Sequence, residues 1–279
     1  MIKYFVTKYL RKLGKKNIIN GQNFVGLLND RLSIDILVRG DHEKEIKRLL
    51  IKNFLSKKRN VALDIGAHIG SYTSMLSLYF SKVYAFEPNK TSFELLKINT
   101  RKNNNIKIFN LFLSNKNLKI KLETNALDSG NTFKSKFGKE IVRGVNSMQF
   151  FNKKKIRKID FIKIDTEGHE FEILKNMHTL IKKYKPIIQI EVLDSEYSKN
   201  SYPKTIKYLK NELNYKYFYI PNNPIKARRR NLILKAYYNL KYIFNTLLFF
   251  KEKLILIEKF ENISYPAIFC TNYKIRKNN

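Results

Sequence analysis

Short apolar runs rich in branched and aromatic residues alternate with stretches of helical apolar spacing along most of the chain. Strand-like runs occur at residues 61–65, 82–86, 106–113, 161–164 and 187–192. Helical patterns lie between most of them, at residues 70–80, 90–103, 169–183 and 203–213. Such alternation is typical of α/β domains in which helices cover both faces of a parallel sheet. The sequence therefore predicts a doubly wound, Rossmann-like sheet.

The residues before this pattern are predicted to form an N-terminal extension, residues 1–40, with one short strand at residues 33–38. Asp41 follows as the predicted N-cap of an amphipathic helix that runs to about residue 56, with Glu43 and Glu45 in its first turn. The remaining residues, 41–279, are predicted to form one domain.

A long segment at residues 221–262 separates two late strand candidates, at residues 216–220 and 267–271. If these strands pair antiparallel, the segment is an insertion in a hairpin. Apolar residues recur through 228–260 at helical spacing, so the insertion is predicted to be helical. Residues 115–158 also interrupt the alternation, and they hold an extra strand candidate at 119–123.

Composition agrees with a folded protein. Hydrophobic residues make up 43% of 279 residues, and 17 Tyr and 20 Phe can bury a sizeable core, so disorder of the whole chain is excluded. One Cys excludes a disulfide framework and any site with several Cys ligands.

The charge is unusual, because 55 basic residues against 23 acidic ones give a formal net charge of +32. Such an excess favours a polyanionic partner such as nucleic acid or an anionic membrane. A compositional drift toward Lys would give the same total, since the basic residues are spread along the chain.

The expected location is cytoplasmic, because the first residues lack the apolar core of a signal peptide and no run reaches the length of a transmembrane helix. Residues 228–260 leave two alternatives open. Basic residues at 228–230 fit an interfacial helix on an anionic membrane, and the same pattern fits a helix or helical hairpin that covers an acceptor site or a subunit interface.

The first motif is VALDIGAHIGSYT, residues 61–73. A buried strand ends near Asp64, and a loop with Gly66, His68 and Gly70 leads into a helix. Glycines allow a tight turn and a close approach of the backbone to a ligand. The spacing differs from the G-x-G-x-x-G fingerprint of dinucleotide-binding proteins, so a diphosphate site is disfavoured.

The second motif is KVYAFEP, residues 82–88, in which a strand ends at Glu87. An acidic residue at the end of the second strand, about 20 residues after the first motif, can accept hydrogen bonds from ribose hydroxyls. An ordinary turn with a solvated Glu is the alternative. The order of strand, loop, helix and strand in the two motifs favours a nucleoside site.

The third motif is IDFIKIDTEGHEFEI, residues 159–173. Polar residues at the carboxyl end of a central parallel strand face the crevice in which ligands bind. Lys163 and Asp165 are two apart and therefore point to the same side of the strand. Glu191 ends the following strand. Pairing of Lys163 with a surface acid, and a role of Glu167 at a helix start, are the structural alternatives.

These three motifs, in this order, resemble the FkbM family of methyltransferases, which belong to the class I enzymes that use S-adenosylmethionine. The resemblance covers about residues 43–220 and resumes at 267–271. It implies a seven-stranded sheet whose last strand is antiparallel, and methylation of a hydroxyl on a sugar, glycan or related metabolite. The family often has a Thr-Leu-Asp-like segment where this chain reads Val-Asn-Ser-Met-Gln, residues 145–149.

The resemblance also implies roles for individual residues. Around the cofactor it places the loop residues, a ribose ligand and residues near the adenine: Asp64, Gly66, His68, Gly70, Glu87, Leu113 and Ser114. Asp165, Glu167 and Gly168 would line the reaction crevice.

Removal of the acceptor proton requires a base, for which Asp165 is the first candidate and His169 the second, with Lys163 and Glu167 beside them. A divalent metal bound by Asp165, Glu167 and Glu191 could lower the acceptor pKa instead. The sequence leaves these options open.

Two alternative functions compete with O-methylation of a small molecule or glycan. An RNA 2′-O-methyltransferase is suggested by the charge and by Lys163, Asp165 and Glu191. However, a second matching Lys is not identifiable, and the basic runs lack interleaved aromatic residues, so nucleic acid is not the expected partner. A non-catalytic, membrane-associated binding module of the same fold is the other alternative.

Overall fold

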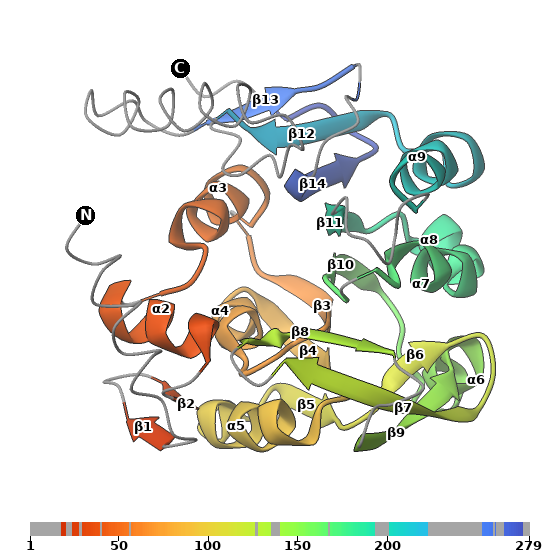
Figure 1. Ribbon diagram of the computed structural model, residues 1–279. Helices are drawn as coiled ribbons and strands as arrows, with labels where there is room; N and C mark the ends of the chain where they lie inside the picture. The colour runs from red at the N-terminus through yellow and green to blue at the C-terminus, as the bar shows by residue number, and fades with distance from the viewer. Residues whose placement is uncertain are drawn as a thin grey trace, which may run out of the picture. The chain divides into compact units, whose positions relative to one another are not determined.

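A computed structural model of the chain describes residues 18–20, 24–27, 30–39, 41–55, 57–125, 128–134, 140–166, 168–192, 201–222, 253–258, 260 and 265–275. These residues belong to two compact units. The first comprises Met1–Lys44 and Lys58–Lys158, and the second comprises Glu45–Lys57 and Ile159–Asn279. Both units combine strands with helices, which confirms the predicted α/β class (Figure 1).

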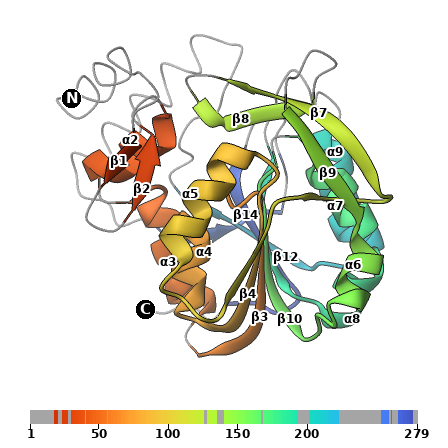
Figure 2. The same ribbon diagram turned by 90° about the horizontal axis from the view of Figure 1, so that it is seen from below.

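The first unit contains three parallel strands in the order β3, β4 and β5. The pairing places Leu63 opposite Tyr84 and Ala85 opposite Ile108. Two helices cover one face of these strands and a third covers the other, as Figure 2 shows. The elements are β3 (Arg59–Ile65), α4 (Ser71–Ser77), β4 (Phe80–Phe86), α5 (Lys90–Thr100), β5 (Ile106–Phe109) and α6 (Ser147–Lys153).

The predicted strand at residues 106–113 is two strands, because the chain leaves the parallel sheet after Phe109. The side chain of Asn110 donates to the carbonyl oxygens of Glu87 and Pro88, at 2.9 Å each, and turns the backbone there. The second piece joins a four-stranded sheet of order β6-β9-β7-β8. Its strands are β6 (Phe112–Ser114), β7 (Leu118–Asn125), β8 (Asp128–Lys134) and β9 (Glu140–Asn146).

The N-terminal residues of the first unit differ from the sequence prediction. Two short strands, β1 (Ile18–Asn20) and β2 (Val25–Leu27), pair antiparallel. The predicted strand at residues 33–38 is wrong, since these residues lie in helix α2 (Arg31–Arg39). The helix starts because an Asp30 carboxylate oxygen accepts hydrogen bonds from the backbone N–H and the hydroxyl of Ser33.

The helix predicted after Asp41 exists as α3 (Lys44–Phe54), but it begins later than expected. Glu45 lies in its first turn, as predicted. Asp41 is too far from the first turn to be its N-cap, and a carboxylate oxygen of Asp41 accepts a hydrogen bond from the Ser71 hydroxyl at 3.0 Å. The division of the chain at residue 41 stays a prediction.

The second unit contains five strands in the order β13-β12-β14-β11-β10. β10 and β11 are parallel, whereas β14 pairs antiparallel with β11, which confirms the predicted antiparallel last strand. Its elements are β10 (Ile159–Ile164), α7 (Glu170–Asn176), α8 (His178–Tyr184), β11 (Ile187–Val192), α9 (Ser201–Lys207), a π-helix (Tyr208–Glu212), β12 (Tyr217–Pro221), β13 (Leu254–Leu256) and β14 (Tyr265–Thr271).

Among the described residues, the first unit has three parallel strands and the second unit has five strands, which makes eight. The sequence predicts a sheet of seven strands. The additional strand is β13, which lies inside the predicted helical insertion and pairs with β12. The prediction of a helix is therefore wrong for Leu254–Leu256. The rest of the insertion, including most of residues 228–260, lies outside the described residues. Among the described helices, none is long and apolar enough to cross a membrane.

Replacement of Gly144 tests the packing of the four-stranded sheet. A Cβ atom at Gly144 would collide with the ring of Phe112 in the neighbouring strand β6. We expect Gly144→Ala to lower the free energy of unfolding by about 1–3 kcal/mol, as overpacking in a core does. Urea unfolding of the wild type and the variant measures this difference in free energy. The double variant Gly144→Ala, Phe112→Leu should recover part of the loss, and a purely additive double variant would contradict this explanation.

Candidate functional site

The loop between β3 and α4 has three residues with left-handed backbone conformations. Gly66 and Gly70 have φ of 83° and 92°, and His68 between them has φ of 49°. A Cβ at Gly70 would lie 2.7 Å from Cδ1 of Leu96 on α5, so glycine is required for both conformation and space. A left-handed His is strained, and such strain persists only where neighbouring contacts hold it.

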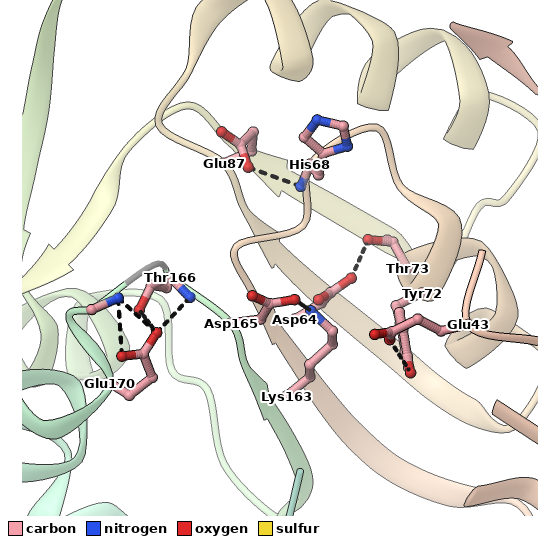
Figure 3. A network of polar contacts seen from close by, with 11 residues as sticks. Glu43, Asp64, His68, Tyr72, Thr73, Glu87, Lys163, Asp165, Thr166 and Glu170 are labelled. Carbon is pink, nitrogen blue, oxygen red and sulfur yellow. Dashed lines mark hydrogen bonds and ion pairs between the residues drawn. The ribbon is translucent and has the colours of Figure 1, made fainter. Parts of the chain in front are cut away.

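Asp64 fixes the end of β3 against the start of α4. Its side chain is fully buried, and one carboxylate oxygen accepts a hydrogen bond from the Thr73 hydroxyl at 2.6 Å. The strand therefore places a buried carboxyl group at the base of the loop, as Figure 3 shows.

Glu87 follows β4 and holds this loop from the other side. One carboxylate oxygen accepts the backbone N–H of His68 at 2.8 Å (Figure 3). The other accepts the backbone N–H of Asn89, also at 2.8 Å. The residue is 6% exposed, and desolvation raises its pKa to about 7. The two backbone donors oppose that rise, whereas the charges of Asp64 and Glu140 add to it.

Ser114 ends strand β6 in the same unit. Its carbonyl oxygen accepts a hydrogen bond from the hydroxyl of Ser147, the first residue of α6, at 3.0 Å. Asn146 is the N-cap of α6, because its side chain accepts from the backbone N–H of Gln149. The residues that differ from the family pattern, 145–149, therefore form a strand end and a capped helix start.

In the second unit, Lys163 and Asp165 lie at the carboxyl end of β10 and point to the same side, as predicted. The Lys163 ammonium is 2.7 Å from a carboxylate oxygen of Asp165. The Lys163 side chain is 6% exposed and that of Asp165 is 31% exposed. A reacting group could thus reach Asp165, whereas Lys163 is enclosed behind it.

Glu170, the first residue of α7, shapes the loop that follows Asp165. Its buried carboxylate accepts the backbone N–H of Thr166 at 2.9 Å, the Thr166 hydroxyl at 3.2 Å and the backbone N–H of Gly168 at 3.1 Å (Figure 3). Burial raises its pKa. By sequence alone, a Glu in the first turn of a helix is expected only to favour the helix start, and the position of Glu170 two residues after the loop glycine Gly168 is the signal that it does more.

The other predicted site residues of this unit are His169, Glu191 and Glu167. His169 precedes α7 and makes no side-chain cap there. Glu191 lies in β11 and is half-buried, and Glu167 lies outside the described residues. The described residues hold no group of three His, Cys, Asp or Glu side chains arranged for a metal ion. Because the predicted metal set includes Glu167, that set stays a prediction.

Comparison with known proteins identifies the family of the chain. The model of the methyltransferase FkbM domain matches residues 64–217, just over half of the 279 residues. The hexuronic acid methyltransferase AglP of Haloferax volcanii is 27% identical over 148 residues. This match covers 52% of the chain and 61% of AglP, so it spans less than two thirds of that relative.

Two solved structures are also similar. The methyltransferase FkbM of Methylobacillus flagellatus KT has a TM-score of 0.46 and 18% identity, with 68% of this chain and 48% of that one covered. Precorrin 8W decarboxylase of Methanobacterium thermoautotrophicum has a TM-score of 0.44 and 16% identity, with 83% and 91% covered.

The raised pKa of Glu87 predicts a pH-dependent stability. An acid whose pKa rises on folding stabilises the fold at low pH, and that contribution is lost as the pH increases from about 4.5 through 7. A shift of this size corresponds to about 3 kcal/mol. In Glu87→Gln, which has no such titration, we expect the decrease in unfolding free energy between pH 5 and pH 8 to be smaller by most of that amount, because pH 5 lies just above the ordinary pKa of 4.5. Equal pH dependence in both proteins, measured by urea unfolding, would refute the assignment.

Proposed function

The chain belongs to the FkbM methyltransferase family, and from that premise we propose that it transfers a methyl group from S-adenosylmethionine to a hydroxyl of a sugar, a glycan or a related metabolite. The observation that carries the proposal is the buried Glu87 carboxylate. Glu87 follows β4, and its carboxylate accepts a hydrogen bond from the left-handed His68 in the loop after β3.

The residues of the first unit fit a nucleoside cofactor. A carboxylate has about four acceptor positions, and Glu87 gives one on each oxygen to a backbone N–H. The remaining positions suit the two ribose hydroxyls. In this proposal Asp64, Gly66, His68 and Gly70 surround the methionine part, and Ser114 lies near the adenine.

The cofactor supplies an electrophilic methyl group on a sulfonium, so the protein has mainly to orient the acceptor and remove its proton. Asp165 is the proposed general base. Its ion pair with Lys163 holds the partly exposed carboxylate in a fixed position. In this proposal Lys163 orients Asp165, and Glu170 fixes the loop that follows it. His169 is the second candidate for the base. A divalent metal at Asp165, Glu167 and Glu191 stays an alternative source of acceptor activation.

A sugar acceptor is supported by AglP, a hexuronic acid methyltransferase that is 27% identical to this chain. The net charge of +32 would favour an anionic acceptor such as an acidic sugar, because opposite charge accelerates encounter. An association of residues 228–260 with an anionic membrane stays a prediction.

Labelled cofactor tests the acceptor class directly. The full chain is incubated with methyl-labelled S-adenosylmethionine and separate glycan, lipid and RNA fractions of a cell extract. We expect label in the glycan fraction or in the sugar part of glycolipids. Label in RNA alone would replace the proposal with an RNA 2′-O-methyltransferase, and absence of cofactor binding by calorimetry would favour a non-catalytic module.

Asp165→Asn separates acceptor chemistry from cofactor binding. Loss of a general base reduces turnover about 10²–10⁴-fold, whereas binding of S-adenosylhomocysteine should change little. Glu172→Gln, an exposed acidic residue in the first turn of α7, is the control and should leave both quantities unchanged. Loss of S-adenosylhomocysteine binding in Asp165→Asn would remove Asp165 from the acceptor side.

A further inference from the structure

Residues that precede the family-matched region contact the loop that is proposed to surround the methionine part of the cofactor. The family model begins at residue 64. The described residues within 24–43, called here the N-terminal segment, belong to the same compact unit as the loop. In Figures 1 and 2, β2 lies beside α5. Leu96 of α5 lies next to Gly70 of that loop.

One side chain joins the N-terminal segment to the loop. Asn99 of α5 accepts the backbone N–H of Val25 at 2.7 Å and donates to the carbonyl oxygen of Val25 at 2.9 Å. The same amide nitrogen donates to the carbonyl oxygen of Ile69 at 2.8 Å. Ile69 is the residue between the strained His68 and Gly70, so Asn99 fixes the backbone where the loop turns.

Apolar packing reinforces this connection. Ile36 of α2, Ile69 of the loop and Leu95 of α5 form one buried cluster. Partly buried apolar side chains of the N-terminal segment pack against it: Phe24, Val25, Leu27 and Leu32. The loop residue thus packs against Leu95 and against several side chains that lie outside the family-matched region.

Two carboxylates at the end of the segment bind the first residues of α4. Asp41 accepts from the Ser71 hydroxyl at 3.0 Å, and Glu43 accepts from the Tyr72 hydroxyl at 2.9 Å (Figure 3). Ser71 and Tyr72 follow Gly70 directly. Glu43 itself has φ of 52°, a conformation that a non-glycine residue keeps only where contacts hold it.

We propose that the N-terminal segment is a positioning element of the cofactor site, acting through Asn99, Asp41 and Glu43. The proposal rests on the proposed use of S-adenosylmethionine. A loop with three left-handed residues has many alternative conformations of similar energy. Contacts on both sides of Gly70, at Ile69 and at Ser71–Tyr72, keep the binding-competent conformation populated. When that population falls, the apparent affinity for the cofactor falls by the same factor.

Asn99→Ala in the full chain is the first test, with S-adenosylhomocysteine binding measured by calorimetry. Asn105→Ala is the matched control. Asn105 also donates to two backbone carbonyl oxygens, those of Ser77 and Phe80, which lie at the other end of α4 and at the start of β4. Both variants lose hydrogen bonds from a side-chain amide to the backbone. Thermal melting curves identify a temperature at which both variants are folded, and binding is measured at that temperature. We expect about a tenfold weaker affinity in Asn99→Ala only.

Tyr72→Phe is the second test, because it removes one hydroxyl and retains the ring. We expect about a threefold to tenfold weaker affinity for S-adenosylhomocysteine and a higher KM for the cofactor, with kcat at saturation and the acceptor KM unchanged. Tyr79→Phe, just after α4, serves as the control.

The outcomes separate the two proposals. Wild-type affinity retained in both Asn99→Ala and Tyr72→Phe would overturn the positioning role alone. Equal weakening in Asn99→Ala and Asn105→Ala would also overturn it, because general destabilisation would then explain the loss. Absence of S-adenosylhomocysteine binding by the wild-type chain would overturn the proposed function together with this inference.

Discussion

The buried carboxylate of Glu87 is the contact on which the arrangement of the first unit depends. It accepts hydrogen bonds from the backbone N–H groups of His68, in the loop after β3, and of Asn89, shortly after β4. Without this acceptor, the left-handed His68 would lose the contact that holds it, and a buried donor would be unsatisfied. The cost is visible in the raised pKa of Glu87, since burial disfavours its charge.

The second unit repeats this solution with another carboxylate. Glu170 accepts the backbone N–H groups of Thr166 and Gly168 and closes the loop after β10. Asp165 in front of that loop is half-buried and paired with Lys163. In both units, a carboxylate gathers the backbone donors of a loop at the carboxyl end of a parallel strand. The loop is thereby formed before any ligand binds, which reduces the entropy that binding has to overcome.

Sequence patterns predicted the elements that are both locally encoded and regular. The strands around Asp64, Glu87 and Asp165 contain apolar runs whose residues are mostly buried, and that pattern is readable without a structure. The patterns failed where one side chain decides the outcome. Asp30 starts a helix where alternating apolar residues predicted a strand, Asn110 divides one predicted strand, and pairing with β12 makes a strand of Leu254–Leu256.

The sequence by itself determined the α/β class, the family and the identity of the polar residues at the strand ends, because these depend on residues that are near each other along the chain. The tertiary structure decided what those residues contact. Asn99 joins Val25, which is 74 residues away, to the carbonyl oxygen of Ile69, and no local pattern encodes such a partner. The surroundings of the loop therefore follow from long-range packing, since hydrogen-bond partners in a folded chain are chosen by proximity in space.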